Sequence, residues 1–161
     1  MVSNENFSVE IDPRTGCWGT WPLDKNDAIL QHNLTAETVS TIGVDEAMDM
    51  YFATNPKKPI WMMKIDVEGA EQKVLKSAHR LLGSMMVKIL LFEVNGVRWE
   101  TMHVNHTGEI AEFDYLTSLG YSIKCTCFGS LWGQQPLTKE GYKEWLTDYQ
   151  YSADCWAHLE E

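Results

Sequence analysis

The sequence predicts an α/β fold, with a partial doubly wound, Rossmann-like sheet that is mostly parallel and closes with a C-terminal antiparallel hairpin. Two observations predict it. Two near-continuous apolar runs, Ile60–Ile65 and Val87–Val94, are typical of buried strands. The residues between them repeat their apolar positions with helical spacing. A strand, a helix and a strand within about 35 residues form a right-handed βαβ unit with parallel strands.

Length and composition predict a single domain over residues 1–161, since 44% of its residues are hydrophobic. The formal net charge is −10. This argues against nucleic acid and anionic membranes as partners, because both bind through Lys and Arg. No run reaches the ~18 apolar residues of a membrane span. The first residues, MVSNENFSVEID, are polar and unlike a signal peptide, so we expect a cytoplasmic protein.

The residues before the first apolar run carry weaker signals. A hairpin is predicted over residues 7–21, where apolar and polar residues alternate around a turn, and 22–37 show no regular pattern. Residues 39–44 are β-prone. Asp45 is a suitable N-cap for a helix that ends near Ala53. The Pro-rich stretch NPKKP then interrupts the chain.

The helix between the two apolar runs is predicted to end at Gly83, since Gly readily takes the conformation that follows a helix. Its core face is formed by apolar residues at helical spacing: Ala70, Val74, Leu75, Ala78, Leu81 and Leu82. Strands with so few polar residues occur in sheets that are covered on both faces. We therefore expect both faces of this sheet to be covered.

After the second apolar run, a helix is predicted over Glu109–Leu119 and a strand over Tyr121–Cys127, with residues 131–133 as its return strand. The helix has a core face at Ile110, Phe113, Leu116 and Leu119.

The chain then ends in helical residues. Thr138 is a suitable cap for a last helix that reaches about Tyr149. The expected core of the domain spans residues 39–133, and a helical tail spans 138–161.

Four cysteines are present, at Cys17, Cys125, Cys127 and Cys155. In a chain without a secretion signal, reduced thiols are expected rather than disulfides. The pair at 125 and 127 lacks further ligands at zinc-finger spacing, so we predict no metal site. Three N-x-[ST] sequons, at Asn6, Asn33 and Asn105, matter only in a luminal protein and are interpreted as coincidental here.

Acidic and amide residues follow the two apolar runs, where ligands bind in open α/β sheets. Asp66 and Glu68 follow the first run, and Glu93 and Asn95 close the second. Asp66 and Glu93 should share one cleft because the two strands are neighbours. Gly69 allows a ligand to approach closely, since it has no Cβ.

Lys64 is unusual because it places a cation in a strand that should be buried on both faces. An unpaired buried charge is costly, so a carboxylate partner such as Glu93 is expected. The acids at this edge are therefore consistent with a structural salt bridge or a helix N-cap as well as with chemistry. The pattern alone leaves both readings open.

The local sequence resembles the FkbM-type methyltransferase family. The octapeptide KIDVEGAE at 64–71 and the strand ILLFEVN at 89–95 carry the resemblance. The stretches VSTIGVDEAMD at 39–49 and FDYLTSLGYSI at 113–123 are similar to flanking elements of the family, in the same order. The resemblance covers residues 39–125.

The resemblance implies methyl transfer from S-adenosylmethionine, commonly to a sugar or another hydroxyl oxygen, in a methyltransferase sandwich. It implies that Asp66 and Glu93 face the methyl-transfer cleft as the catalytic pair. Glu68 and Glu71 would shape that cleft, together with Lys64, Gly69 and Asn95. A carboxylate there would orient or deprotonate the acceptor hydroxyl, or hold a divalent ion that lowers its pKa.

The family's cofactor half is not recognisable in the sequence. We find no Gly-rich turn after a first strand and no acid at the end of a second one, and residues 16–19 are interpreted as a hairpin turn. We therefore expect a truncated, C-terminal part of the domain, with cofactor-binding residues unassigned, weak cofactor binding by this chain alone, and self-association through the exposed sheet edge.

Two alternatives stay open. One is a non-catalytic interaction domain derived from the methyltransferase fold, which the seven Trp residues favour as interface anchors. The other is a metal-binding protein that uses His103, His106 and nearby acids, for which the sequence places no third ligand.

Overall fold

The computed structural model describes residues 41–67, 69–95, 106–126, 141, 143 and 152–160. The helices and strands of these described residues lie within one compact unit, Gly43–Glu161. In chain order they are α2 (Val44–Thr54), β1 (Ile60–Ile65), α3 (Glu71–Ser77), α4 (His79–Gly83), β2 (Val87–Asn95), α5 (His106–Ser118), β3 (Tyr121–Cys125) and β4 (Ser152–Leu159).

Some predicted elements lie outside the described residues. These are the hairpin over 7–21, the irregular stretch 22–37 and the return strand over 131–133. Of the predicted helix over 138–149, positions 141 and 143 are described, and both are helical. The β-prone run 39–44 is wrong at its described end, because Thr41, Ile42 and Gly43 form no strand and Val44 begins α2.

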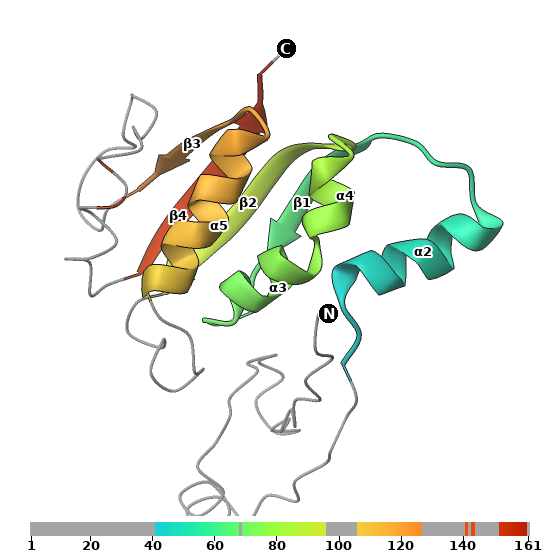
Figure 1. Ribbon diagram of the computed structural model, residues 1–161, viewed down its shortest axis with the longest axis horizontal. Coiled ribbons are helices and arrows are strands. Elements are labelled where there is room, and N and C mark those ends of the chain that lie inside the picture. Colours follow the sequence, from blue (N-terminus) through green and yellow to red (C-terminus); the bar gives the residue numbers. More distant parts are fainter. Residues whose placement is uncertain are drawn as a thin grey trace, which may run out of the picture. The chain divides into compact units, whose positions relative to one another are not determined.

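The four described strands form one sheet in the order β1-β2-β4-β3 (Figure 1). β1 and β2 pair in parallel, as the βαβ pattern predicts. β4 is antiparallel to both of its neighbours. The fold is therefore α/β with a mixed sheet. The prediction of a mostly parallel sheet is wrong, and a doubly wound arrangement is not confirmed.

β4 is the element that changes the topology. Its residues, SADCWAHL, fall in the predicted helical tail, but they form a strand between β2 and β3. The side chains of Ala153, Cys155 and Ala157 alternate with more exposed neighbours and are buried at 3%, 2% and 0% exposure. This two-residue period is typical of a strand with one face on the core. The predicted tail over 138–161 is thus corrected at 152–159.

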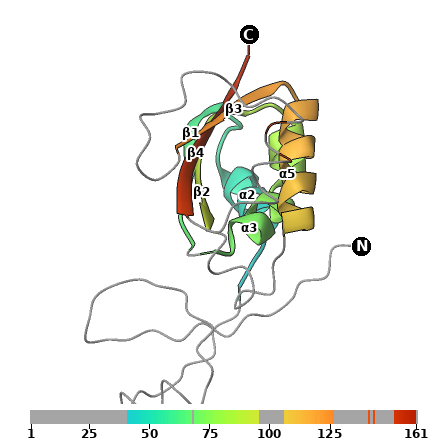
Figure 2. The same cartoon turned by 90° about the vertical axis from the view of Figure 1, so that its left-hand side faces the viewer.

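Helices α3, α4 and α5 lie on one face of the sheet (Figure 2). The helix predicted between the two apolar runs is divided at Ala78, whose N–H bonds the carbonyl of Leu75 at 3.0 Å. Four residues of its predicted core face are confirmed, since Leu75, Ala78, Leu81 and Leu82 are buried, whereas the other two are only partly buried. These four pack with Leu90, Phe92, Phe113 and Leu116 in one hydrophobic core.

The opposite face of the sheet carries no helix in the described part of the chain. On β2, Leu90 and Phe92 point to the core, whereas Leu91 and Glu93 lie on the opposite face and are only half-buried. Lys64 of β1 pairs with Leu91 and is exposed. The expectation that Lys64 is buried is therefore wrong.

Asp45 caps a helix other than its own. α2 begins after Gly43, without a side-chain cap. The Asp45 carboxylate instead accepts the backbone N–H groups of Arg80 and Leu81, at 2.9 and 2.8 Å, near the start of α4. Arg80 in turn donates to the carboxylate of Asp49 at 2.6 Å. The preference of Asp for free helix N–H groups is met across the fold rather than locally.

Cys125 and Cys155 form a disulfide between β3 and β4. The expectation of reduced thiols is wrong for these two cysteines. It was based on the polar first residues, which are unlike a signal peptide, whereas the antiparallel pairing of β3 with β4 places the two cysteines opposite each other. No described helix is long and apolar enough to cross a membrane.

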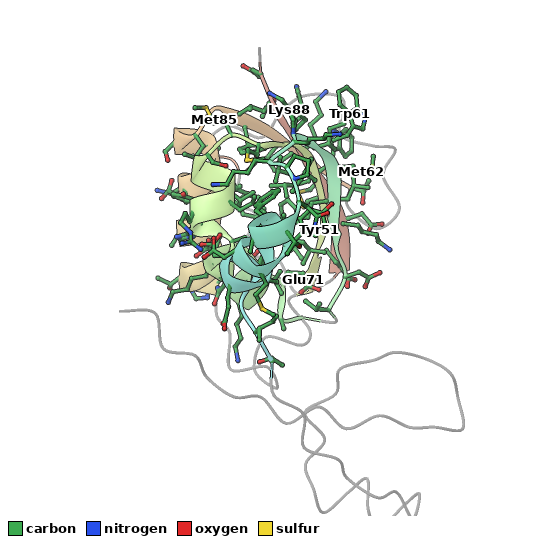
Figure 3. All side chains as sticks on the ribbon, turned by 90° about the vertical axis from the view of Figure 1, so that its right-hand side faces the viewer. Tyr51, Trp61, Met62, Glu71, Met85 and Lys88 are labelled. Atoms are coloured by element: carbon green, nitrogen blue, oxygen red, sulfur yellow. A yellow bond between two sulfur atoms is a disulfide. The ribbon has the colours of Figure 1, made fainter. Side chains whose placement is uncertain are left out.

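We expect the free edge of β1 to cause self-association. Within the described residues, no strand pairs with that edge. Trp61 and Met62 lie there and are 74% and 51% exposed (Figure 3). Unpaired strand edges with apolar side chains recruit other strands. Sedimentation velocity at micromolar concentration should show a dimer or larger species, and Trp61→Glu should shift it to monomer.

Met50→Glu is the matched control for this edge. Met50 is also exposed, at 64%, but it lies on α2 rather than on a strand edge. We expect this variant to associate as the wild type does. A wild-type chain that sediments as a monomer over the same concentration range would contradict the prediction.

Candidate functional site

The carboxyl ends of β1 and β2 meet at one edge of the sheet. The register pairs Ile65 with Phe92, so Asp66 and Glu93 come next on the two neighbouring strands. Leu91 and Glu93 lie on the face away from the helices, and Asp66 contacts Lys64 on that same face. The structure therefore brings the two predicted catalytic carboxylates to one edge.

Asp66 is accessible at this edge. Its carboxylate accepts a hydrogen bond from Lys64 at 2.8 Å, and the two side chains are 51% and 68% exposed. The hydrogen bond and the charge of Asp66 raise the pKa of Lys64. The expected carboxylate partner of Lys64 is thus confirmed, with Asp66 in that role. Asp66 does not cap α3, which begins after Ala70 without a side-chain cap.

Glu71 holds the loop between β1 and α3. Its side chain is 2% exposed and its carboxylate accepts the backbone N–H of Val67 at 3.0 Å. Burial raises the pKa of Glu71, whereas backbone N–H groups of the loop lower it. Gly69 has a φ of 100°, a left-handed conformation that favours glycine. The charge of Glu93 also raises the pKa of Glu71. Glu71 and Gly69 therefore fix the path of the chain after Asp66.

Asp154 joins the edge from β4, and the sequence did not indicate it. It pairs with Glu93 in the antiparallel register and is exposed. Its charge also raises the pKa of Lys64. Three neighbouring strands thus bring Asp66, Glu93 and Asp154 to one region of the sheet, with Lys64 as the nearby cation. Like charges on opposed strands are unfavourable, so this edge suits a ligand with positive charge or hydroxyl donors.

A second group of acids lies on the buried face of helix α5. Glu109 and Glu112 of α5 are 2% and 5% exposed. Oε1 of Glu109 has no hydrogen-bond partner in the described part of the chain, and burial, with the charges of Glu71 and Glu112, raises its pKa to about 8. Glu112 instead contacts His79 at 2.6 Å. Glu109 is therefore an uncharged carboxylic acid near neutral pH.

The buried face of α5 explains why these acids were missed. The predicted core face begins at Ile110, but the most buried residues are Glu109, Glu112, Phe113 and Leu116. These buried residues also repeat with helical spacing, but the face that they form is rotated slightly from the predicted one. Phe113 and Leu116 confirm the prediction. Ile110 is only partly buried, because the helix is rotated toward its acids.

Three residues of the predicted sites, Glu68, Asn95 and His103, are not settled by the geometry. Glu68 lies outside the described residues, as does His103 of the metal alternative. Asn95 closes β2, but its side chain also lies outside them. Among the described side chains, no group of three or more His, Cys, Asp or Glu residues is arranged to hold a metal ion.

The comparison with known families identifies the chain. A model of the methyltransferase FkbM domain matches residues 6–123. The chain belongs to the FkbM methyltransferase family. The match begins well before residue 39 and ends inside β3, so it includes the acids of β1 and β2. β4, with Asp154 and Cys155, lies beyond it. No curated protein matches the chain.

Proposed function

We propose that this FkbM-family protein transfers a methyl group from S-adenosylmethionine to a hydroxyl oxygen of a sugar or a similar acceptor. The observation that carries the proposal is the pairing of Ile65 with Phe92, which brings Asp66 and Glu93 to one strand edge within the family match. Ligands of open α/β sheets bind at such edges.

The chemistry needs a group that manages the proton of the acceptor. Methyl transfer breaks the sulfur–carbon bond of the donor and forms an oxygen–carbon bond, while the hydroxyl loses its proton. A carboxylate that accepts a hydrogen bond from the hydroxyl orients the oxygen, and it takes the proton as the oxygen becomes acidic. We assign this role to Asp66, the exposed carboxylate, with Glu93 beside it as a second acceptor.

The acids of this edge fit the charge of S-adenosylmethionine. Its sulfonium is positively charged when bound, and this charge suits an edge with Asp66, Glu93 and Asp154. The described residues include no Gly-rich turn for the methionine part and no assigned acid for the ribose. We therefore place the reacting groups at this edge and assign no residue to the nucleoside.

The test is methyl transfer by the purified protein. The protein is incubated with S-adenosylmethionine labelled in its methyl group and with a panel of sugars and polyols. We expect label in at least one acceptor, together with an equal amount of S-adenosylhomocysteine. A reaction without acceptor measures background hydrolysis. Absence of transfer to every acceptor, with no binding of S-adenosylhomocysteine by calorimetry, would contradict the proposal.

A second candidate is a non-catalytic interaction domain, and the exposed Trp61 and Met62 favour it. Large exposed apolar side chains at a strand edge are typical of interfaces. A protein that associates through β1, but neither binds S-adenosylhomocysteine nor transfers methyl groups, would favour this candidate over the enzyme.

A further inference from the structure

The disulfide between Cys125 and Cys155 lies at a position where the backbone already brings the two residues together. They are directly opposite in the antiparallel pairing of β3 with β4, and their Cα atoms are 4.0 Å apart. This separation is far below the roughly 7 Å beyond which two cysteines cannot be bridged. The pairing of the strands and the pairing of the sulfurs therefore agree.

The bond is part of the hydrophobic core. Cys125 and Cys155 are 7% and 2% exposed. Cys155 pairs with Phe92 on its other side, and the Phe92 ring contacts Phe113 of α5 at 5.7 Å between centroids. Thiol–disulfide exchange requires a thiolate to reach one sulfur. A bond covered in this way is inaccessible to thiols while the sheet is folded, which favours a permanent structural role over a switch.

The sheet topology indicates what the bond stabilises. β4 is the last strand in the chain but lies inside the sheet, and among the described strands β3 joins the others only through β4. The two cysteines are 30 residues apart in sequence. A disulfide restricts the unfolded chain by closing such a loop. It therefore holds the late, inner strand against the strand that depends on it.

We propose that the Cys125–Cys155 disulfide is a permanent part of the folded protein, and that the protein therefore folds in an oxidising compartment. The two thiols lose two protons and two electrons, and the acceptor is the disulfide of a thiol–disulfide oxidoreductase, which becomes a dithiol. Structural disulfides of this kind are rare in the cytosol. The bond argues against the cytoplasmic location expected from the sequence.

One other observation agrees with this location. The sequence also carries three N-x-[ST] sequons, which are used only in a secretory lumen. The hydroxyl residue of the third sequon, Thr107, is exposed near the start of α5. In such a lumen, these sequons would be potential N-glycosylation sites.

The first experiment measures the bond and its effect on folding. Purified protein is alkylated without reductant, digested and analysed by mass spectrometry, and its melting is recorded with and without a strong reductant. We expect a linked peptide pair containing Cys125 and Cys155. Because the bond closes a loop of this length, reduction should lower the melting temperature by roughly 10 °C.

Variants distinguish the effect of the disulfide on melting from the effect of replacing a cysteine. The double variant Cys125→Ala/Cys155→Ala keeps small apolar side chains in the core and should melt like the reduced wild type. Cys127→Ser, two residues from Cys125, is the matched control and should keep both the linked peptides and the higher melting temperature. Equal melting of the wild type and the double variant would overturn the structural role of the bond.

The second experiment tests the compartment in intact source cells. Cells are quenched in acid and free thiols are trapped with a maleimide before lysis, so that the redox state in the cell is preserved. We expect Cys125 and Cys155 to remain unlabelled, and a decrease in mass after N-glycosidase treatment supports a luminal location. Labelling of both cysteines before any reduction would overturn the proposal, and it would leave the methyl-transfer proposal unaffected.

Discussion

Asp66→Asn is expected to remove most of the methyl-transfer activity while leaving the fold intact. The substitution keeps the size of the side chain but removes the negative charge that would accept the hydroxyl proton. A positioned acid or base contributes about 100-fold or more to such reactions, so turnover should fall by at least that factor. Turnover of labelled S-adenosylmethionine and urea unfolding should be measured on the same preparation.

The structure explains why the fold should tolerate this change. Asp66 does not cap α3, and its ion pair with Lys64 is exposed. Exposed ion pairs contribute little to stability. The urea midpoint of the variant should therefore stay close to that of the wild type, so that loss of activity is separated from loss of structure.

Asp49→Asn is the matched control for Asp66. Asp49 is also an exposed carboxylate in an ion pair, with Arg80 at 2.6 Å, but it lies on α2 away from the strand edge. We expect this variant to keep wild-type turnover. If Asp66→Asn keeps activity within a few-fold of the wild type at equal stability, Asp66 has only a structural role.

The βαβ unit could be predicted from the sequence because its signals are local. The apolar runs of β1 and β2 and the helical spacing of Leu75, Ala78 and Leu82 lie within a few turns of one another, and the structure confirms them. Parallel pairing then follows from the helical crossover that connects the two strands. For the same reason, Asp66 and Glu93 could be placed at one edge.

β4 could not be predicted, because its signal is not local. Its buried side chains, Ala153, Cys155 and Ala157, are small, so the alternation produces little hydrophobic contrast. Its inner position is set by pairing with strands far away in sequence. The disulfide and the contribution of Asp154 to the edge depend on that pairing, so both were missed together.

The buried acids were missed for a different reason. Glu is among the residues least often found fully buried without a partner, so a sequence pattern assigns it to solvent. In α5, Phe113 and Leu116 define the core face. At the N-terminal end of this face, Ile110 and Glu109 both fit the helical spacing. Only the packing of α5 against α3 shows that Glu109 takes the buried position.

Stability should fall as the pH rises, because of Glu109. Its folded-state pKa is raised to about 8, from 4.5 for a free side chain. Between these values the folded protein holds a proton that the unfolded chain has lost. The stabilising effect is complete below about pH 4.5 and is lost as the pH rises through 8. At about 1.36 kcal/mol per pKa unit, the loss between pH 5 and 8 is a few kcal/mol.

Glu109→Gln should remove this part of the pH dependence. Gln has nearly the same shape but cannot ionise, so the variant avoids the burial of a charge at high pH. We expect it to be more stable than the wild type at pH 9 and to show a shallower slope of unfolding free energy between pH 5 and 8. Urea unfolding at several pH values measures both quantities.

Glu46→Gln provides the control, because it removes the same formal charge from an exposed position on α2. We expect its slope to match that of the wild type. Glu71 and Glu112 have pKa values raised by burial as well, so a smaller slope should remain in Glu109→Gln. If the slopes of Glu109→Gln and the wild type are equal, the Glu109 carboxylate is ionised in the folded protein. It must then have a partner that neutralises it beneath α5.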